Sequence, residues 1–244
     1  MNGTLTVLEL FSGTECISNA FRDHGHECLT LDYESKFNPT FCMDIRNFVP
    51  SLLNGKKIDV LWASPDCTTF SVASLPYYWI KQGDFSFPKN RRSLFGIENV
   101  MIILDLIKEI RPKCWFMENP VGMMRTLPIL RDIERKHVTY CSYGDVRMKP
   151  TDIWTNCTSF DPREPCHNGN LYCHHERAPA GSKFGTQGLK DSVERSKIPS
   201  DLCKEIVMAS QNYIKGGGDF WLYRTDIVRQ TSFSSKDWGV THLD

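Results

Sequence analysis

One cysteine stands where a thiol could act as a nucleophile. The stretch WASPDCTTFS, residues 62–71, joins an apolar run to a Pro-Asp-Cys turn that contains Cys67 and is followed by hydroxyl residues. A thiolate is a strong nucleophile, but a free cysteine with a pKa of about 8.5 is only a few per cent ionised at pH 7. We therefore expect the groups that activate Cys67 to come from other parts of the chain.

Two further segments supply such groups. The run CWFMENP, residues 114–120, is apolar at first and then carries the carboxyl group of Glu118. The segment VRMK, residues 146–149, supplies the cations Arg147 and Lys149. A thiol, a carboxyl group and a cation at the ends of neighbouring strands indicate catalysis more sharply than any one of them alone.

The elements that would position these groups follow an alternating pattern of apolar runs and amphipathic segments. We predict strands over 4–11, 27–34, 58–64, 114–120 and 137–146, and helices over 16–25, 93–112, 127–137 and 198–214. Polar residues gather at the carboxyl ends of the strands. This pattern predicts an α/β fold, a doubly wound sheet with helices on both faces that binds ligands beyond those ends.

The turn after the first predicted strand indicates a nucleotide-like ligand. Gly13 permits a tight turn that brings backbone N–H groups and a helix N-terminus towards a ligand. Asp32 follows 19 residues later, where a carboxylate can accept hydrogen bonds from ribose hydroxyls. The turn lacks the complete G-x-G-x-x-G pattern, so the pair favours an adenosine-containing cofactor without a strong pyrophosphate site.

Composition and charge limit the class of protein. The 244 residues fit one mid-sized domain, or one domain with a small appendage, and 41% hydrophobic and 24% charged residues are ordinary for a globular protein. There is no apolar run of about 18 residues and no signal-peptide pattern, so we expect a cytoplasmic protein without a membrane partner. The 29 basic and 29 acidic residues balance, so a nucleic acid would have to bind local basic patches.

Most of the ten cysteines are expected to be ordinary. Six stand singly in apolar or mixed surroundings and are predicted to be reduced, packed thiols: Cys16, Cys28, Cys42, Cys114, Cys141 and Cys203.

Taken in order, the segments resemble the motifs of the DNA (cytosine-5)-methyltransferases, especially the small forms encoded by phages. SPDCTTFS resembles P-P-C-Q-x-F-S, and MENP resembles E-N-V. LELFSGTE is similar to the first cofactor motif, D/E-L-F-x-G, and MDI, residues 43–45, to G-D-I. RRSLF, YGDVRMK and IPSDLCKEI are similar to the R-x-L-F, Y-G-x-x-Q-x-R and V-P-P-x-L-x-x-x-I segments, so the matches span roughly residues 5–206.

The resemblance implies a Rossmann-like methyltransferase that uses S-adenosylmethionine to methylate C5 of a cytosine flipped out of DNA. It implies that Cys67 attacks C6 and that Glu118 holds N3 of the base. Arg147 and Lys149 would hold the base O2 or a flanking phosphate and favour the thiolate. The implied cofactor site consists of Phe11, Ser12, Gly13, Thr14, Asp32, Tyr33, Asp44, Ile45 and Pro65.

Some residues depart from the family pattern. Thr14 and Glu15 stand where glycines are common, which leaves a modified sulfonium donor open. Arg147, Lys149 and Thr151 stand where the family has Gln, Arg and Arg, so we expect Arg147 or Lys149 to replace the cation lost at Thr151. Two alternatives stay open: methylation of RNA cytosine, for example in tRNA, and a catalytically weakened nucleic-acid-binding protein of the same fold.

Two segments are assigned to DNA contact. We expect residues 72–92 to be a closing loop that offers Lys89, Arg91 and Arg92 to phosphates. Residues 157–192 take the place of the family's target recognition region, but this segment is far shorter than that region. We therefore predict that the protein recognises a short DNA sequence.

The segment 157–192 also contains a set of metal-binding residue types. Cys157, Cys166, Cys173 and His174, with His175 beside it, can supply four zinc ligands to a lobe too small to build its own core. Packed thiols and surface histidines are the alternative, because the spacing matches no C-x2-C finger. We expect a monomer with a catalytic domain over 1–156 and 193–215, this lobe over 157–192 and a C-terminal extension over 216–244.

Overall fold

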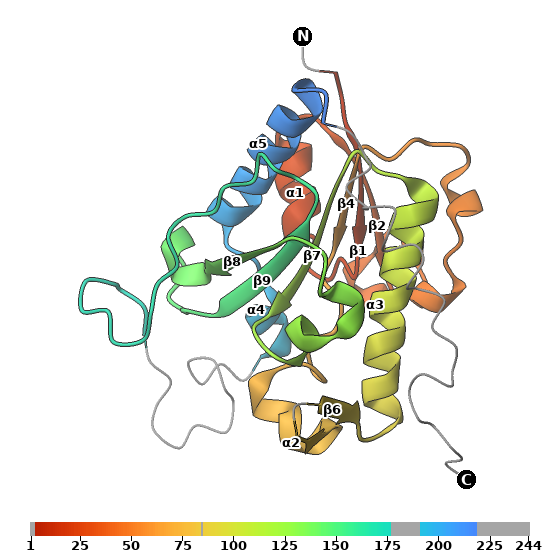
Figure 1. Ribbon diagram of the computed structural model, residues 1–244. Coiled ribbons are helices and arrows are strands. Elements are labelled where there is room, and N and C mark those ends of the chain that lie inside the picture. Colours follow the sequence, from red (N-terminus) through yellow and green to blue (C-terminus); the bar gives the residue numbers. More distant parts are fainter. Residues whose placement is uncertain (1–2, 84, 177–190, 219–244) are drawn as a thin grey trace.

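The computed structural model describes residues 3–83, 85–176 and 191–218, and its centre is a seven-stranded sheet (Figure 1). The strand order is β3-β2-β1-β4-β7-β9-β8. The neighbours from β3 to β7 are parallel, whereas β9 is antiparallel to both β7 and β8. The strands are β1 (Thr6–Leu10), β2 (Glu27–Asp32), β3 (Phe41–Cys42), β4 (Val60–Ala63), β7 (Cys114–Pro120), β8 (Arg135–Thr139) and β9 (Pro150–Thr155).

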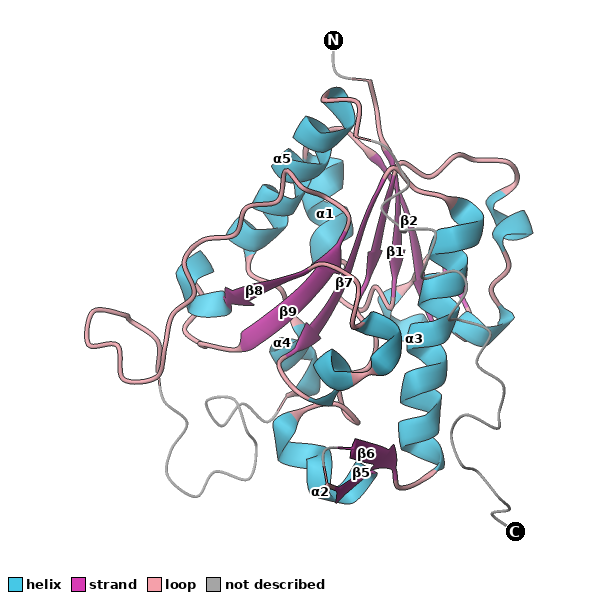
Figure 2. Ribbon diagram, in the orientation of Figure 1, coloured by secondary structure: helices cyan, strands magenta, loops and turns pink. Residues whose placement is uncertain are grey.

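Helices cover both faces of the sheet, as the sequence predicted (Figure 2). On one face, α1 (Cys16–Asp23) and α5 (Ser200–Lys215) pack together and bury Phe21 and Ile206 against β1, β4 and β7. On the other face, α3 (Arg91–Ile110) buries Val100 and Ile103 in a second core. The fold is therefore an α/β, Rossmann-like sheet with an apolar core on each side.

The sequence explains where α3 begins and ends. The Asn90 side chain accepts a hydrogen bond from the Ser93 backbone N–H, and the Ser93 hydroxyl accepts one from the Asn90 backbone N–H, which satisfies two donors at the helix start. The helix stops at Ile110 because Arg111 has a left-handed φ of 55° and Pro112 cannot continue it.

The remaining short elements lie mostly at the edges of the sheet. They are α2 (Leu75–Tyr78), α4 (Ser192–Ser196), the antiparallel hairpin β5 (Trp79–Gln82) and β6 (Phe85–Pro88), and the 3-10 turns η1 (Ser35–Phe37), η2 (Ile45–Asn47), η3 (Pro50–Leu53), η4 (Val72–Ser74), η5 (Met123–Thr126), η6 (Pro128–Leu130) and η7 (Tyr140–Tyr143). In Figure 1 the hairpin lies below the sheet, at the end where β7 finishes.

Three predictions about elements are wrong. The expected helix over 127–137 is only the turn η6 followed by β8, because Leu127 and Leu130 are buried as anchors of that turn and the chain then pairs with β9. The expected strand over 137–146 ends at Thr139 and becomes η7. The expected loop over 72–92 contains α2 and the hairpin instead, and β9 was not predicted at all.

The segment 157–192 is irregular where it is described. Residues 157–176 contain turns but no helix or strand. The rest of the expected lobe, 177–190, and most of the expected extension, 219–244, lie outside the described residues. Within the described ranges, no helix combines the length and the apolar character needed to cross a bilayer.

Candidate active site

Cys67 lies in a tight loop after β4 that its neighbours hold in place. The Asn119 side chain donates to the Pro65 carbonyl at 2.9 Å, and the backbone N–H groups of Phe70 and Ser71 donate to the Cys67 carbonyl at 3.0 and 2.9 Å. The Asp66 carboxylate accepts a hydrogen bond from the Thr68 N–H at 2.9 Å. The sequence offered no reason for an acid beside Cys67; the structure shows that Asp66 caps the turn.

Two glycines allow other elements to approach this loop closely. A Cβ atom at Gly122 would lie 2.0 Å from the Phe70 carbonyl oxygen, and one at Gly96 of α3 would lie 2.5 Å from the Thr69 hydroxyl. Any side chain at Gly122 would therefore displace the backbone that follows Cys67.

Glu118 lies on the strand next to the Cys67 loop. Ala63 at the end of β4 pairs with Met117, so Glu118 is level with Ser64 at the start of the loop. Glu118 is only 6% exposed, and the Tyr140 hydroxyl donates to its Oε1 at 3.1 Å. Burial raises the pKa of Glu118, although the Lys149 charge and the hydrogen bond from Tyr140 oppose that shift. A carboxyl group in this setting can keep a proton and donate it.

The same surroundings act on the thiol. Burial raises the pKa of Cys67 to about 11; the Lys149 cation opposes the shift, and the Asp66 and Glu118 carboxylates add to it. Cys67 is a protonated thiol at neutral pH in this state, so its proton must leave before it can attack.

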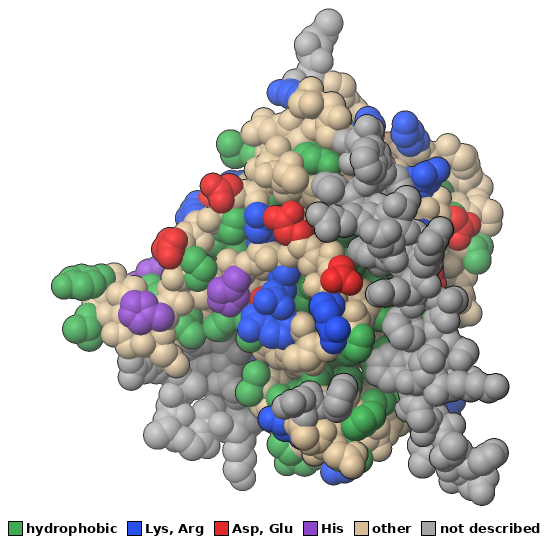
Figure 3. Space-filling model, viewed as in Figure 1, with side chains coloured by type: hydrophobic (Ala, Val, Ile, Leu, Met, Phe, Trp, Pro, Cys, Tyr) green, Lys and Arg blue, Asp and Glu red, His purple; other side chains and the backbone are tan. Residues whose placement is uncertain are grey.

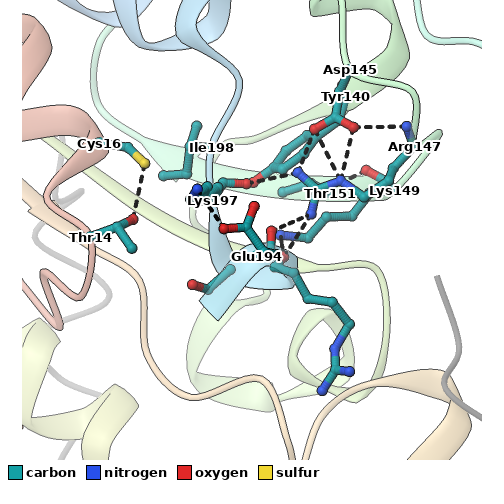
Figure 4. A network of polar contacts seen from close by, with 12 residues as sticks. Thr14, Cys16, Tyr140, Asp145, Arg147, Lys149, Thr151, Glu194, Lys197 and Ile198 are labelled. Atoms are coloured by element: carbon teal, nitrogen blue, oxygen red, sulfur yellow. Dashed lines mark hydrogen bonds and ion pairs between the residues drawn. The ribbon is translucent and has the colours of Figure 1, made fainter. Parts of the chain in front are cut away.

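Lys149 is the cation whose charge acts on both groups. It has a left-handed φ of 30°, and its Nζ lies 4.4 Å from the centre of the Tyr140 ring and donates to the Arg195 carbonyl at 3.2 Å (Figure 4). Its charge favours the ionised form of Cys67 and of Glu118. Thr151 is fully buried, and its hydroxyl donates to the Lys149 carbonyl at 3.0 Å.

Arg147 behaves differently from the prediction. Its guanidinium has five N–H donors, and all five are used: on the Asp145 carboxylate and on the backbone carbonyls of residues 194, 195 and 197 (Figure 4). Arg147 is 5% exposed. These contacts are those of a structural residue that joins the chain before the lobe to the chain after it. They leave no donor for a base.

A cavity of about 260 Å³ lies between the carboxyl ends of β1 and β2 and helix α3. Five of the nine predicted cofactor residues line it, namely Phe11, Asp32, Tyr33, Asp44 and Ile45. The Tyr33 side chain is 68% exposed, so one face of its ring is available for stacking. Asp66 also lines the cavity, which places the Cys67 loop at its wall.

The other four predicted cofactor residues shape the cavity rather than line it. The Gly13 N–H donates to Asp32 Oδ2 at 2.8 Å, and the Thr14 hydroxyl lies 3.1 Å from the Cys16 thiol. The Ser12 hydroxyl is buried at the start of this turn and has no protein partner. Pro65 is the carbonyl acceptor of Asn119. Left-handed φ values at Phe11, Gly13 and Glu15 bend this turn around the end of β1.

Sequence reasoning missed several residues of the cavity, namely Met43, Arg46, Phe95 and Asn99. Arg92, which was assigned to phosphate contact, also lines it. The family-like RRSLF segment carries Arg92 and Phe95, so its match was the available signal. Tyr140 gave none, because its contact with Glu118 depends on how β8 ends.

Glu9 was missed as well. It stands in the first cofactor motif and accepts a hydrogen bond from the Ser18 N–H at 2.8 Å, which fixes the first turn of α1 to β1.

The predicted zinc ligands do not all meet. Cys157 is buried in the core beside Cys114, and the His174 Nε2 lies 3.0 Å from the Asp145 carbonyl. The described residues bring together a different set: Cys141, Cys166, Cys173 and His175. Cys141 was predicted to be a packed thiol; it is buried, but its sulfur faces the lobe.

The predicted phosphate-binding cations lie around the hairpin and the start of α3. The Lys89 Nζ donates to the Pro76 carbonyl at 3.3 Å, Arg91 stacks on Phe95, and Arg92 lies 3.8 Å from the Asp66 carboxylate. Figure 3, viewed as Figure 1, shows Lys and Arg side chains near the middle of this face and histidines to their left.

Known proteins match this chain in three comparisons. The family model of the C-5 cytosine-specific DNA methylases matches residues 5–129, just over half of the chain. A "Probable DNA (cytosine-5)-methyltransferase" of Frog virus 3 (isolate Goorha) is 26% identical over 220 residues, which cover 83% of this chain and 99% of the relative.

Two solved structures are similar at lower identity. A mutant DNMT2 of Spodoptera frugiperda is 15% identical with a TM-score of 0.42, over 62% of this chain and 49% of that one. The Entamoeba histolytica methyltransferase EhMeth is 11% identical with a TM-score of 0.44, over 63% and 52%. The match spans about half the length of both.

The family match covers the cofactor turn, the Cys67 loop and the strand that carries Glu118. The chain belongs to the family of C-5 cytosine-specific DNA methylases.

Proposed function

We propose that this protein transfers a methyl group from S-adenosylmethionine to C5 of cytosine in DNA. One observation carries the proposal: the Cys67 loop and Glu118 lie at the carboxyl ends of two adjacent parallel strands, and the same loop forms a wall of the cavity over β1 and β2. A nucleophile, an acid and a cofactor pocket thus share one sheet edge.

The roles of the residues follow from their surroundings. The Cys67 thiolate adds to C6 of the base, and the electron pair of the C5–C6 bond moves into the ring. Glu118 donates its proton to N3, so the ring does not accumulate negative charge. C5 then takes the methyl group and loses its proton to a base. The C6–S bond breaks to release the Cys67 thiolate, and the N3 proton returns to Glu118. Because the reacting carbons lie inside a duplex, the base must be flipped out.

The cavity fits the cofactor. S-adenosylmethionine, when bound, supplies an electrophilic methyl group on a sulfonium. Asp32 still has acceptor capacity for ribose hydroxyls, Tyr33 offers a ring face to the adenine, and the unpaired Ser12 hydroxyl lies in the adjoining turn. Three acids, Asp32, Asp44 and Asp66, line the cavity against two cations, Arg46 and Arg92, and this excess of negative charge suits a positively charged donor.

We also propose the domain roles that the sequence predicted. Residues 1–156 and 193–215 act as the catalytic domain and the lobe over 157–192 contacts the target. The protein works as a monomer in the cytoplasm of a bacterial or phage-infected cell.

Bisulfite sequencing tests the assignment. DNA from cells that express the wild type should contain conversion-resistant cytosines in one short sequence context, and DNA from cells that express Cys67→Ala should contain none. The purified protein should transfer labelled methyl groups to duplex DNA in preference to tRNA. If only tRNA is labelled, the substrate is RNA rather than DNA. If the protein binds DNA but shows no methyl transfer that depends on Cys67, it is a weakened nucleic-acid-binding protein instead of an enzyme.

A further inference from the structure

A cluster of three thiols and one imidazole lies outside the candidate active site. The Sγ atoms of Cys141, Cys166 and Cys173 and a ring nitrogen of His175 all lie within 4.8 Å of one another. Cys141 is in η7, directly after β8, whereas the other three belong to the irregular segment 157–176. The cluster therefore joins the edge of the catalytic sheet to the lobe.

The spacing of the ligand atoms is close to that of a tetrahedral zinc site. With Zn–S bonds of about 2.3 Å and Zn–N bonds of about 2.1 Å, neighbouring ligand atoms lie about 3.6–3.8 Å apart. The Cys166 Sγ and the His175 Nδ1 are already 3.6 Å apart. The widest separation, 4.8 Å, closes to that value with a shift of about 1 Å.

Hydrogen bonds around Cys166 suit a metal-bound thiolate. The Asn170 side chain donates to the Cys166 Sγ at 3.4 Å, and the Cys166 backbone N–H donates to the Thr139 hydroxyl at 2.7 Å, which ties the lobe to the end of β8.

Cys157 and Phe160 anchor the start of the segment in the core, but none of residues 161–176 is buried. Residues 157–176 form no helix or strand, and Leu171 and Tyr172 at the tip of the loop are 93% and 100% exposed. Figure 3 shows hydrophobic side chains at the end of this projecting loop. A loop that exposes its apolar residues cannot be held by a core of its own, so a cross-link at its base would fix it.

We propose that Cys141, Cys166, Cys173 and His175 bind one structural Zn²⁺ that fastens the lobe to the catalytic sheet. The ligand types favour this metal, because three thiolates and one imidazole are soft donors that bind zinc in preference to magnesium or calcium. With four protein ligands the site is closed, so its role is to hold structure rather than to activate water.

The position of Cys141 gives the site a consequence for the active site. Cys141 follows Tyr140, whose hydroxyl donates to Glu118, and the chain continues through η7 to Lys149. The lobe also contacts this segment, because the Glu176 N–H donates to the Val146 carbonyl at 2.8 Å. Bound zinc would therefore hold both the loop and the backbone that leads to Lys149.

Metal analysis of the full-length protein, purified with reductant and zinc in the medium, tests the proposal. The wild type should carry about one equivalent of zinc, and Cys141→Ser, Cys173→Ser and His175→Ala should each retain less than about 0.2 equivalents. The adjacent His174→Ala is the matched control for His175→Ala, and Cys42→Ser, an exposed cysteine of β3, is the control for the cysteine variants. Both controls should keep about one equivalent.

A second measurement remains informative if a ligand variant fails to fold. Wild-type protein loaded with Co²⁺ should show thiolate-to-cobalt charge-transfer bands and the intense visible bands of a tetrahedral site. Zinc below about 0.2 equivalents in the wild type, or Co²⁺ spectra without thiolate bands, would overturn the site. So would loss of zinc in His174→Ala with retention in His175→Ala, or a disulfide among the three cysteines. These readouts need no methyl transfer, so failure of the proposed function leaves them intact.

Discussion

The two halves of the sheet build their parts of the site by different means. In the parallel half, β3-β2-β1-β4, the cavity is shaped by short turns and by backbone groups. Asp32 accepts from the N–H groups of Gly13 and Glu34, and left-handed residues bend the turn over 11–15. These contacts join residues that are close in sequence or at the ends of paired strands.

In the half formed by β7, β9 and β8, the site depends on buried charges. Arg147 spans 50 residues to reach the Lys197 carbonyl, and Asp152, fully buried in β9, accepts two hydrogen bonds from Arg125. A buried charge that loses its partner costs far more than a lost turn contact. The comparison teaches that the cofactor half should tolerate side-chain changes and the β7-β9-β8 half should not.

The largest effect is expected for Arg147→Met. The change removes the guanidinium from the buried Asp145 carboxylate, which keeps only the backbone N–H of residue 147, and takes its donors from the carbonyls of residues 194 and 197, so the free energy of unfolding should fall by about 3–5 kcal/mol. Lys149→Met removes one hydrogen bond and one cation–π contact and should cost only about 1–2 kcal/mol. Urea denaturation measures both.

For catalytic activity per folded molecule we expect the opposite order, with a larger loss in Lys149→Met than in Arg147→Met. Lys149→Met should lower kcat/KM by about 10- to 100-fold, because the cation that favours the Cys67 thiolate is lost. Equal losses of stability in the two variants would break the distinction between a structural Arg147 and a functional Lys149.

Glu9 is the buried charge of the cofactor half and tests the comparison there. Burial raises its pKa to about 7, against hydrogen bonds from Ser18 that lower it. The folded protein therefore holds a proton that the unfolded chain releases near pH 4.5, and this group costs stability as pH rises from about 4.5 to 7.

Replacement of Glu9 by Gln removes that titration. The stability of Glu9→Gln relative to wild type should rise by about 3 kcal/mol between pH 4.5 and pH 7.5. Urea denaturation over that range measures the difference, with Glu15→Gln, at the start of α1, as the control. A constant difference would show that Glu9 is ionised in the folded state.

Sequence reasoning succeeded best for the longer parallel strands, β7 as well as β1, β2 and β4. The strand over 114–120 has the predicted bounds, and β1, β2 and β4 lie inside their predicted ranges, because buried parallel strands are continuous apolar runs. The cofactor turn and the Cys67 loop lie at strand ends, where alternation of strands and helices places them.

It failed where the structure depends on distant partners. The segment 127–137 has helical spacing, but pairing with β9 makes its second part a strand, and β9 carries polar residues such as Asp152 that hide it. From the sequence, Arg147 and Lys149 could not be distinguished: they are two cations that stand four and two positions before Thr151. Only the carbonyls of residues 194–197, brought back by the chain after the lobe, separate their roles.

The pH dependence of methyl transfer joins the two halves, since Cys67 follows β4 and Glu118 is in β7. The proposed mechanism needs an ionised Cys67 and a protonated Glu118. The first form grows tenfold per pH unit below a pKa of about 11, and the second falls tenfold per unit above the pKa of Glu118. Between the two pKa values the gain in ionised Cys67 and the loss of protonated Glu118 offset each other. The kcat/KM of the wild type should therefore change little with pH in this range.

Glu118→Gln keeps a hydrogen-bond donor that does not titrate. Its kcat/KM should start far lower but rise by about 100-fold from pH 7 to pH 9, following the thiolate alone. The measurement is kcat/KM for a duplex substrate at each half pH unit. If the pH profiles of kcat/KM for the wild type and Glu118→Gln run parallel, Glu118 does not supply a proton in the reaction.

The smallest expected effect belongs to Tyr33, the exposed ring on the cofactor cavity. Stacking on one base is worth about 1–3 kcal/mol, and a half-exposed ring lies at the low end, so Tyr33→Ala should weaken S-adenosylhomocysteine binding by about tenfold. Tyr33→Phe keeps the ring and loses only an exposed hydrogen bond to Glu34, so its Kd should stay within about twofold of the wild type. Calorimetry measures both, with Tyr77→Ala, an exposed tyrosine of α2, as the control.

If Tyr33→Phe and Tyr33→Ala weaken binding equally, the hydroxyl rather than the ring recognises the ligand. A side-chain hydrogen bond would then be essential in the half of the sheet where turns and backbone groups were expected to suffice.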